Sequence, residues 1–168
     1  MIAAATAEQP IVCKLLAEGT LTSAGLASMR RESEIIGLPL VEVLQLNDLI
    51  SEAGIAQAYA DSSGLRFLDL TRRPPTRAWV LTVPENVARR KNCLIFGEVS
   101  GELVAVVADP IDPSVRAALQ ARFERPIQYV VSPRYQILEV INDVYGTARA
   151  QGARLTSVTP MATAVAEG

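Results

Sequence analysis

The 168-residue sequence contains no histidine and only two lysines. Histidine is the most common general base and a frequent metal ligand, so its absence removes the usual starting point for catalysis. Neither Lys14 nor Lys91 follows the glycine-rich sequence of a P-loop, in which backbone amides and a lysine hold nucleotide phosphates. We therefore expect a chain that catalyses nothing and holds no cofactor or metal.

An excess of charge and a long apolar run are also missing. The chain has 16 basic and 18 acidic residues, a formal charge of −2, whereas a nucleic-acid surface needs a clustered positive field. No apolar run approaches the length of a membrane span, and the opening MIAAATAEQP lacks the basic segment and apolar core of a signal peptide. These absences predict a soluble, cytoplasmic protein.

The two cysteines, Cys13 and Cys93, lie far apart within apolar runs. A disulfide or a zinc site would need a partner thiol or histidine at a suitable spacing, which the sequence does not offer. We expect both cysteines to be reduced thiols buried in the core.

An internal repeat is the strongest positive signal in the sequence. Residues 10–33 align with residues 39–62 at a constant shift, so that Pro10 falls on Pro39. Self-similarity at a fixed shift indicates one supersecondary unit used twice. Because proline suits the first turn of a helix, each copy is predicted to begin a helix at its proline.

Each copy predicts a helix-turn-helix. Gly19 and Asp48 can take the left-handed conformation that ends the first helix of each copy. Thr22 and Ser51 are suitable N-caps for the second helices, and Gly64 is placed to end the last of them. Two copies are too few for a solenoid, so a small helical bundle is expected.

The second half of the chain changes its hydrophobic period. Two β-rich runs joined by a Gly101 turn predict a hairpin, and a third run predicts another strand. Apolar stripes at helical spacing surround these runs. The sequence therefore predicts an α+β fold in which helices pack on a small sheet. The strands are expected at 93–98, 103–108 and 126–131. The helices are expected at 84–91, at 114–123 after Asp112 as N-cap and Pro113 at the first helical position, and from Pro133.

Three segments follow from these patterns. Residues 1–70 are expected to form the helical repeat subdomain and residues 71–146 the α+β subdomain, with a boundary near the Arg72-Arg73-Pro74-Pro75 run. Residues 147–168 are rich in Ala, Thr, Ser and Gly and are expected to form a flexible, disordered linker.

Four sequence blocks carry a resemblance to a known family. They are GLRFLDL (64–70), VPENVARR (83–90), LVAVVADPIDP (103–113) and INDVYG (141–146). In this order they resemble the N-terminal domain of the type II secretion and type IV pilus assembly ATPases.

The resemblance implies an adaptor rather than an enzyme. In that family the domain precedes the motor and docks it onto the cytoplasmic domain of an inner-membrane platform protein. The chain would then be cytoplasmic and peripheral to the inner membrane through its partner. The linker would lead to an ATPase domain, outside this sequence, where ATP binds.

One branch of that family offers an alternative function, since it binds cyclic di-GMP through paired motifs with arginine, glycine and glutamine at fixed places. Arginine would stack on guanine and chelate phosphate, and the small glycine would let the backbone come close to the ligand. Here the three positions are occupied by Pro10, Val12 and Ser33 in the first copy and by Pro39, Val41 and Ser62 in the second. We expect the repeat to keep its fold and to have lost this ligand, leaving a regulatory cyclic dinucleotide module as the alternative.

The first copy is the candidate docking surface. Its leucines offer more apolar surface than two short helices can bury between themselves, and a pair of arginines would form a charged rim. The alternative is an ordinary core made with the second copy. The candidate partner-binding residues are Leu15, Leu16, Leu21, Leu26, Met29, Arg30 and Arg31.

Overall fold

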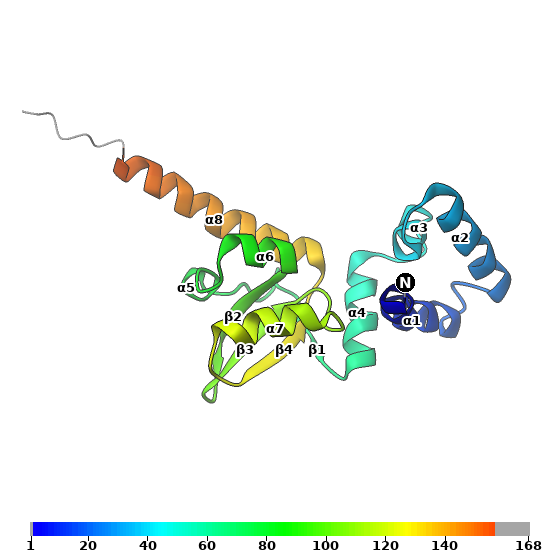
Figure 1. The fold of residues 1–168 in the computed structure, drawn as a ribbon, viewed down its shortest axis with the longest axis horizontal. Helices are drawn as coiled ribbons and strands as arrows, with labels where there is room; N and C mark the ends of the chain where they lie inside the picture. Colours follow the sequence, from blue (N-terminus) through cyan, green and yellow to red (C-terminus); the bar gives the residue numbers. More distant parts are fainter. Residues whose placement is uncertain (1, 157–168) are drawn as a thin grey trace, which may run out of the picture.

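The structure, a computed structural model, describes residues 2–156 of the chain (Figure 1). Its N-terminal part consists of helices, and its C-terminal part is a small sheet with further helices packed on it. The predicted α+β class is confirmed. Among the described residues, none of the helices combines the length and the apolar character that crossing a bilayer requires.

The N-terminal part holds two helix pairs, as the repeat predicts. They are α1 (Ile2–Ala17) with α2 (Ser23–Ile36), and α3 (Leu40–Leu46) with α4 (Glu52–Ser63). The turns inside the pairs are equivalent, because Gly19 has a φ of +72° and Asp48 a φ of +55°. The N-caps are equivalent as well, since the side-chain oxygens of Thr22 and Ser51 each accept a backbone N–H at 3.1 Å. The turn and cap predictions are confirmed.

Two expectations about the first helix were wrong. Pro10 does not begin α1 but lies inside it, because the alanines that precede it are strong helix formers and extend the helix to Ile2. Cys13 is exposed, because Ile11, Val12 and Leu15 occupy the buried face of α1. Cys93 is buried as predicted, and burial raises the pKa of its thiol to about 11.

The sheet has four strands in the order β1-β4-β3-β2. The strands β2 (Cys93–Val99) and β3 (Glu102–Val107) form the predicted antiparallel hairpin, in which Gly101 has a φ of +84°. β4 (Ile127–Val131) runs parallel to β3 on one side and to β1 (Arg66–Phe67) on the other. β1 falls within residues 1–70, which were expected to form the helical repeat subdomain, but it is part of the sheet.

Four further helices complete the chain: α5 (Arg77–Val80), α6 (Glu85–Lys91), α7 (Pro113–Arg122) and α8 (Arg134–Thr156). α6 packs against both α7 and α8. The predicted start of α7 is confirmed, because the Asp112 carboxylate accepts the backbone N–H of Ser114 at 2.8 Å.

The last helix is longer than expected. The flexible linker was predicted from residue 147, but α8 continues to Thr156 and projects away from the sheet (Figure 1). Two polar contacts with the rest of the α+β part accompany this extension. Arg149 forms an ion pair with Glu85 at 2.6 Å, and Arg77 donates a hydrogen bond to Gln151 at 3.2 Å. The rest of the predicted linker, residues 157–168, lies outside the described residues.

The buried apolar side chains form two clusters. One gathers Ile11, Leu15, Leu40, Leu44 and their neighbours in the helical part, and it also includes Val131 at the end of β4. The other fills the space between the sheet and its helices around Ile95, Leu119 and Ile141.

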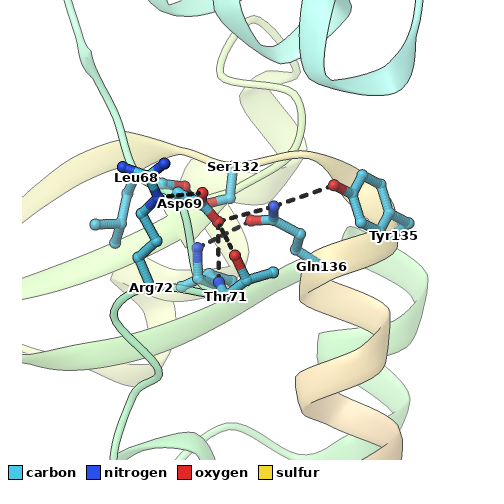
Figure 2. A network of polar contacts seen from close by, with 8 residues as sticks. Leu68, Asp69, Thr71, Arg72, Ser132, Tyr135 and Gln136 are labelled. Carbon is cyan, nitrogen blue, oxygen red and sulfur yellow. Dashed lines mark hydrogen bonds and ion pairs between the residues drawn. The ribbon is translucent and has the colours of Figure 1, made fainter.

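A buried polar network fastens the segment after β1 to the start of α8 (Figure 2). Gln136, only 5% exposed, accepts the backbone N–H of Leu70 at 2.9 Å and donates to the Asp69 carboxylate at 3.0 Å. The Thr71 hydroxyl donates to the same carboxylate and holds the pKa of Asp69 below its usual value. This part of the network is therefore present at neutral pH and weakens as the pH falls through that lowered pKa.

Replacing Gln136 by leucine should lower the free energy of unfolding by about 1–3 kcal/mol, because it leaves the buried N–H of Leu70 without an acceptor. Denaturant unfolding measures the effect, and Gln120→Leu is the matched control, since Gln120 is exposed on α7 and takes no part in the network. A Gln136→Leu variant as stable as the unmodified chain would contradict the structural role of the network.

Candidate functional site

A pocket of about 280 Å³ lies where the second repeat meets the sheet part. α3 and α4 supply one wall, including Val41 and Tyr59, while residues next to β2, β3 and α8 supply the other. Asn92 has a φ of +47° and ends α6, Asp109 follows β3, and Arg134 begins α8. These three positions of the α+β part thus bring polar side chains next to the α3–α4 helix pair.

The charges in this pocket do not favour an anion. Three carboxylates, those of Glu42, Glu52 and Asp109, share the lining with the single cation Arg134. Two of the carboxylates already accept hydrogen bonds from backbone N–H groups of this chain. Glu52 accepts the backbone N–H of Tyr135 at 2.9 Å, and Asp109 accepts that of Ile111 at 2.8 Å.

The remaining polar groups of the pocket are weakly reactive. Burial first, and then the Asp109 carboxylate, raise the pKa of Tyr59 to about 12, so its hydroxyl stays protonated at neutral pH. The side-chain oxygen of Asn92 is buried and has no hydrogen-bond partner among the described residues. No group of three histidine, cysteine, aspartate or glutamate side chains within those residues could hold a metal ion.

Of the six positions that would read cyclic di-GMP, Pro39 and Val41 line this pocket, and three others make contacts within the fold. Val12 is 5% exposed, so its side chain belongs to the core. The hydroxyl of Ser33 donates to the Leu38 carbonyl at 2.6 Å, and that of Ser62 donates to the Tyr59 carbonyl at 3.1 Å. Both hydroxyls are therefore already bonded to backbone carbonyls of the chain itself.

The candidate docking residues separate into two groups. Leu15 and Leu21 are 2% and 5% exposed and belong to the core, which corrects their assignment to the surface. They are buried because the second repeat packs against them, which was the alternative left open by the sequence. Leu16, Arg30 and Arg31 are exposed, and Leu26 and Met29 are partly buried against the core.

Sequence reasoning missed the most exposed apolar side chains of the helical part. Ile35 is 85% exposed and Ile36 50%, both at the end of α2, and Leu46 at the end of α3 is 67% exposed. A signal was available, because two adjacent isoleucines on a helix cannot both face the side that carries Leu26 and Met29.

The comparisons with known proteins agree with this architecture. The MshEN domain family matches residues 63–151, more than half of the chain. The chain belongs to the MshEN domain family. The resemblance to the N-terminal domains of secretion ATPases is thereby confirmed. No match was found among curated proteins.

Solved structures of two proteins superimpose over most of the chain. A structure of MshE with cdg has a TM-score of 0.67 at 25% identity, covering 78% of this chain and 95% of that one. The N-terminal domain of XpsE has a TM-score of 0.63 at 28% identity, covering 81% of this chain and 94% of the other. A second crystal form of the XpsE domain gives a TM-score of 0.51.

Proposed function

We propose that the chain is a non-catalytic adaptor that docks a secretion ATPase onto the cytoplasmic domain of an inner-membrane platform protein. It would act in the cytoplasm and be peripheral to that membrane through its partner. ATP would bind to the motor domain of the full-length protein, outside this sequence. The similarity to the XpsE N-terminal domain supports this role.

Helix α2 carries the proposal, because none of its 14 residues is buried. It nevertheless contains Leu26, Met29, Ile35 and Ile36, of which Ile35 is almost fully exposed. An amphipathic helix whose apolar side chains are at most partly buried in its own chain has apolar surface available for a partner. Arg30 and Arg31 lie beside that face and would form its charged rim.

Charge reversal at the rim tests the proposal. The double variant Arg30→Glu/Arg31→Glu should bind the cytoplasmic domain of the platform protein about tenfold more weakly at low salt, and the loss should shrink at high salt because rim charges are screened. Calorimetry at two salt concentrations measures both effects.

A matched control comes from the other half of the chain. Arg90 is also exposed and lies on α6, so Arg90→Glu should leave binding unchanged. If the double variant binds like the unmodified chain at both salt concentrations, α2 is not the docking surface. If no complex forms with the unmodified chain, the adaptor role itself is wrong.

A regulatory cyclic dinucleotide module is the second candidate function. Two observations favour it: the MshE structure contains cdg, an abbreviation of cyclic di-GMP, and this chain has a pocket beside its second repeat. Two further observations weigh against it. The pocket carries three carboxylates, and the hydroxyls of Ser33 and Ser62 are already bonded to backbone carbonyls.

A further inference from the structure

A second surface lies on the sheet, away from α2. A groove of about 780 Å³ follows the first half of β4 and is bounded by the chain that enters β1. Its floor is apolar and includes Phe96, Val104 and Val130. Neither the proposed adaptor role nor the cyclic dinucleotide alternative uses this groove.

The groove runs along an unpaired strand edge. β1 is only two residues long and pairs with Val130 and Val131 alone, so the first three residues of β4 have a strand neighbour on one side only. At the opposite edge of the sheet, β2 is bulged between Ile95 and Gly97 and packs against α5. The β1 side therefore offers the more accessible edge.

The direction of the backbone groups on this edge follows from the bonds on either side of β4. The Pro126 carbonyl accepts from Leu103, and the Ser132 N–H donates to Val107, so the even-numbered residues of β4 face β3. Val131 faces the other way, because its carbonyl accepts the N–H of Leu68 at 2.8 Å. Ile127 and Tyr129 share the orientation of Val131, and their N–H groups point outward beyond the end of β1.

Positive charge surrounds this edge. Arg66, Arg73 and Arg116 line the groove, all three are exposed, and no acidic residue lines it. Within residues 2–156 none of the three forms an ion pair. The chain as a whole carries a charge of −2, so this concentration of unpaired arginine is local.

Tyr129 adds a polar group that the fold leaves unused. Its ring lies 4.7 Å beneath the guanidinium of Arg116. Its hydroxyl is buried and, among the described residues, has no hydrogen-bond partner. The contact holds Arg116 over Tyr129, beside the strand edge that lines the groove.

We propose that an extended acidic segment of a partner protein binds here by adding a strand beside Ile127–Tyr129. The outward N–H groups would bond to the peptide backbone, alternate apolar side chains would rest on the groove floor, and carboxylates would meet the three arginines. Charge complementarity selects an acidic peptide. The strand edge favours a peptide over a nucleic acid, whose binding depends on phosphate contacts rather than on strand pairing.

A synthetic peptide provides the direct test. The fluorescein-labelled peptide Thr-Glu-Val-Glu-Val-Glu-Thr-Glu should bind the unmodified chain with a Kd below about 1 mM by fluorescence anisotropy. Its counterpart with lysine in place of glutamate should not bind. The acidic peptide with N-methylated backbone nitrogens should bind at least about tenfold more weakly, because N-methylation removes the peptide N–H that would bond to the outward carbonyl of Ile127, and the added methyl groups prevent close strand pairing.

Protein variants separate this surface from the one on α2. Arg66→Glu and Arg116→Glu should each weaken binding of the acidic peptide about fivefold, the scale of a reversed exposed charge pair. Arg90→Glu and Arg30→Glu/Arg31→Glu should leave it unchanged. Hydrogen exchange at the Ile127 and Tyr129 amides should slow when the peptide is bound.

The proposal is overturned if the acidic peptide does not bind, or if its N-methylated form binds equally well. It is also overturned if oligo-dT binds more tightly than the peptide, since the arginines would then form a nucleic-acid surface. None of these outcomes depends on whether α2 docks to a platform protein, so failure of one proposal leaves the other standing.

Discussion

Replacing Leu44 by alanine is expected to lower the free energy of unfolding by about 2–5 kcal/mol. Leu44 is 0% exposed and lies in the cluster that joins both helix pairs, so the shortened side chain leaves a cavity between α1 and α3. Ile141→Ala should have an effect of the same size in the second cluster, where Ile141 is also 0% exposed. Denaturant midpoints followed by circular dichroism measure both losses.

The control for Leu44 lies two residues away on the same helix. Leu46 is 67% exposed, so Leu46→Ala should change the free energy of unfolding by less than about 0.5 kcal/mol. Equal losses for the two leucines would show that α3 is rotated from the orientation described above. An unchanged midpoint for Ile141→Ala would show the same for α8.

Cyclic di-GMP is expected to bind no more tightly than about 1 mM, which corresponds to a binding free energy of about −4 kcal/mol. Proline cannot replace an arginine that chelates phosphate, and the two serine hydroxyls are already bonded to backbone carbonyls. The pocket beside the second repeat carries three carboxylates against one arginine, so a ligand with two phosphates would meet net repulsion there. Calorimetry measures the affinity.

The N-terminal domain of MshE, titrated under the same conditions, is the positive control for this experiment. Low-micromolar binding by the present chain, lost on Arg134→Ala, would overturn our interpretation of the substituted positions. The pocket would then be a working nucleotide site.

Local signals in the sequence were sufficient for the helix ends. Thr22, Ser51 and Asp112 are N-caps, and Gly64 ends α4 with a φ of +64°, because these positions depend on a few adjacent residues. The buried stripe of α7 was predictable for the same reason, since Val115 and Leu119 follow helical spacing.

The sequence failed where the outcome depends on contacts between distant segments. β1 spans two residues, too few for a period, and is a strand only because β4 pairs with it. α8 extends beyond residue 147 together with contacts to Glu85 and Arg77, far away in the chain. The burial of Leu15 and Leu21 likewise required knowing that the second repeat packs on the first.

The docking surface stays a prediction; what the sequence anticipated of α2 is the exposure of its arginines, and what it missed is which apolar side chains are exposed. Arg30 and Arg31 are exposed as a rim requires, whereas Ile35 rather than Leu15 offers apolar surface. The groove along β4 could not be predicted, because its arginines come from three separate segments that only the sheet brings together.

The length of α8 has a mechanical consequence. A helix of 23 residues is about 34 Å long, so tilting it by about 10° at its base would displace its far end by about 6 Å. Gly146 lies within it, and glycine is among the weakest helix formers, which makes this turn the softest point of the rod. The ion pair between Glu85 on α6 and Arg149 on α8 ties the part of α8 beyond Gly146 to α6. Together with the Arg77–Gln151 hydrogen bond, this ion pair stiffens a lever arm, and removing the Glu85 carboxylate would weaken the coupling between the motion of the sheet and that of the helix end.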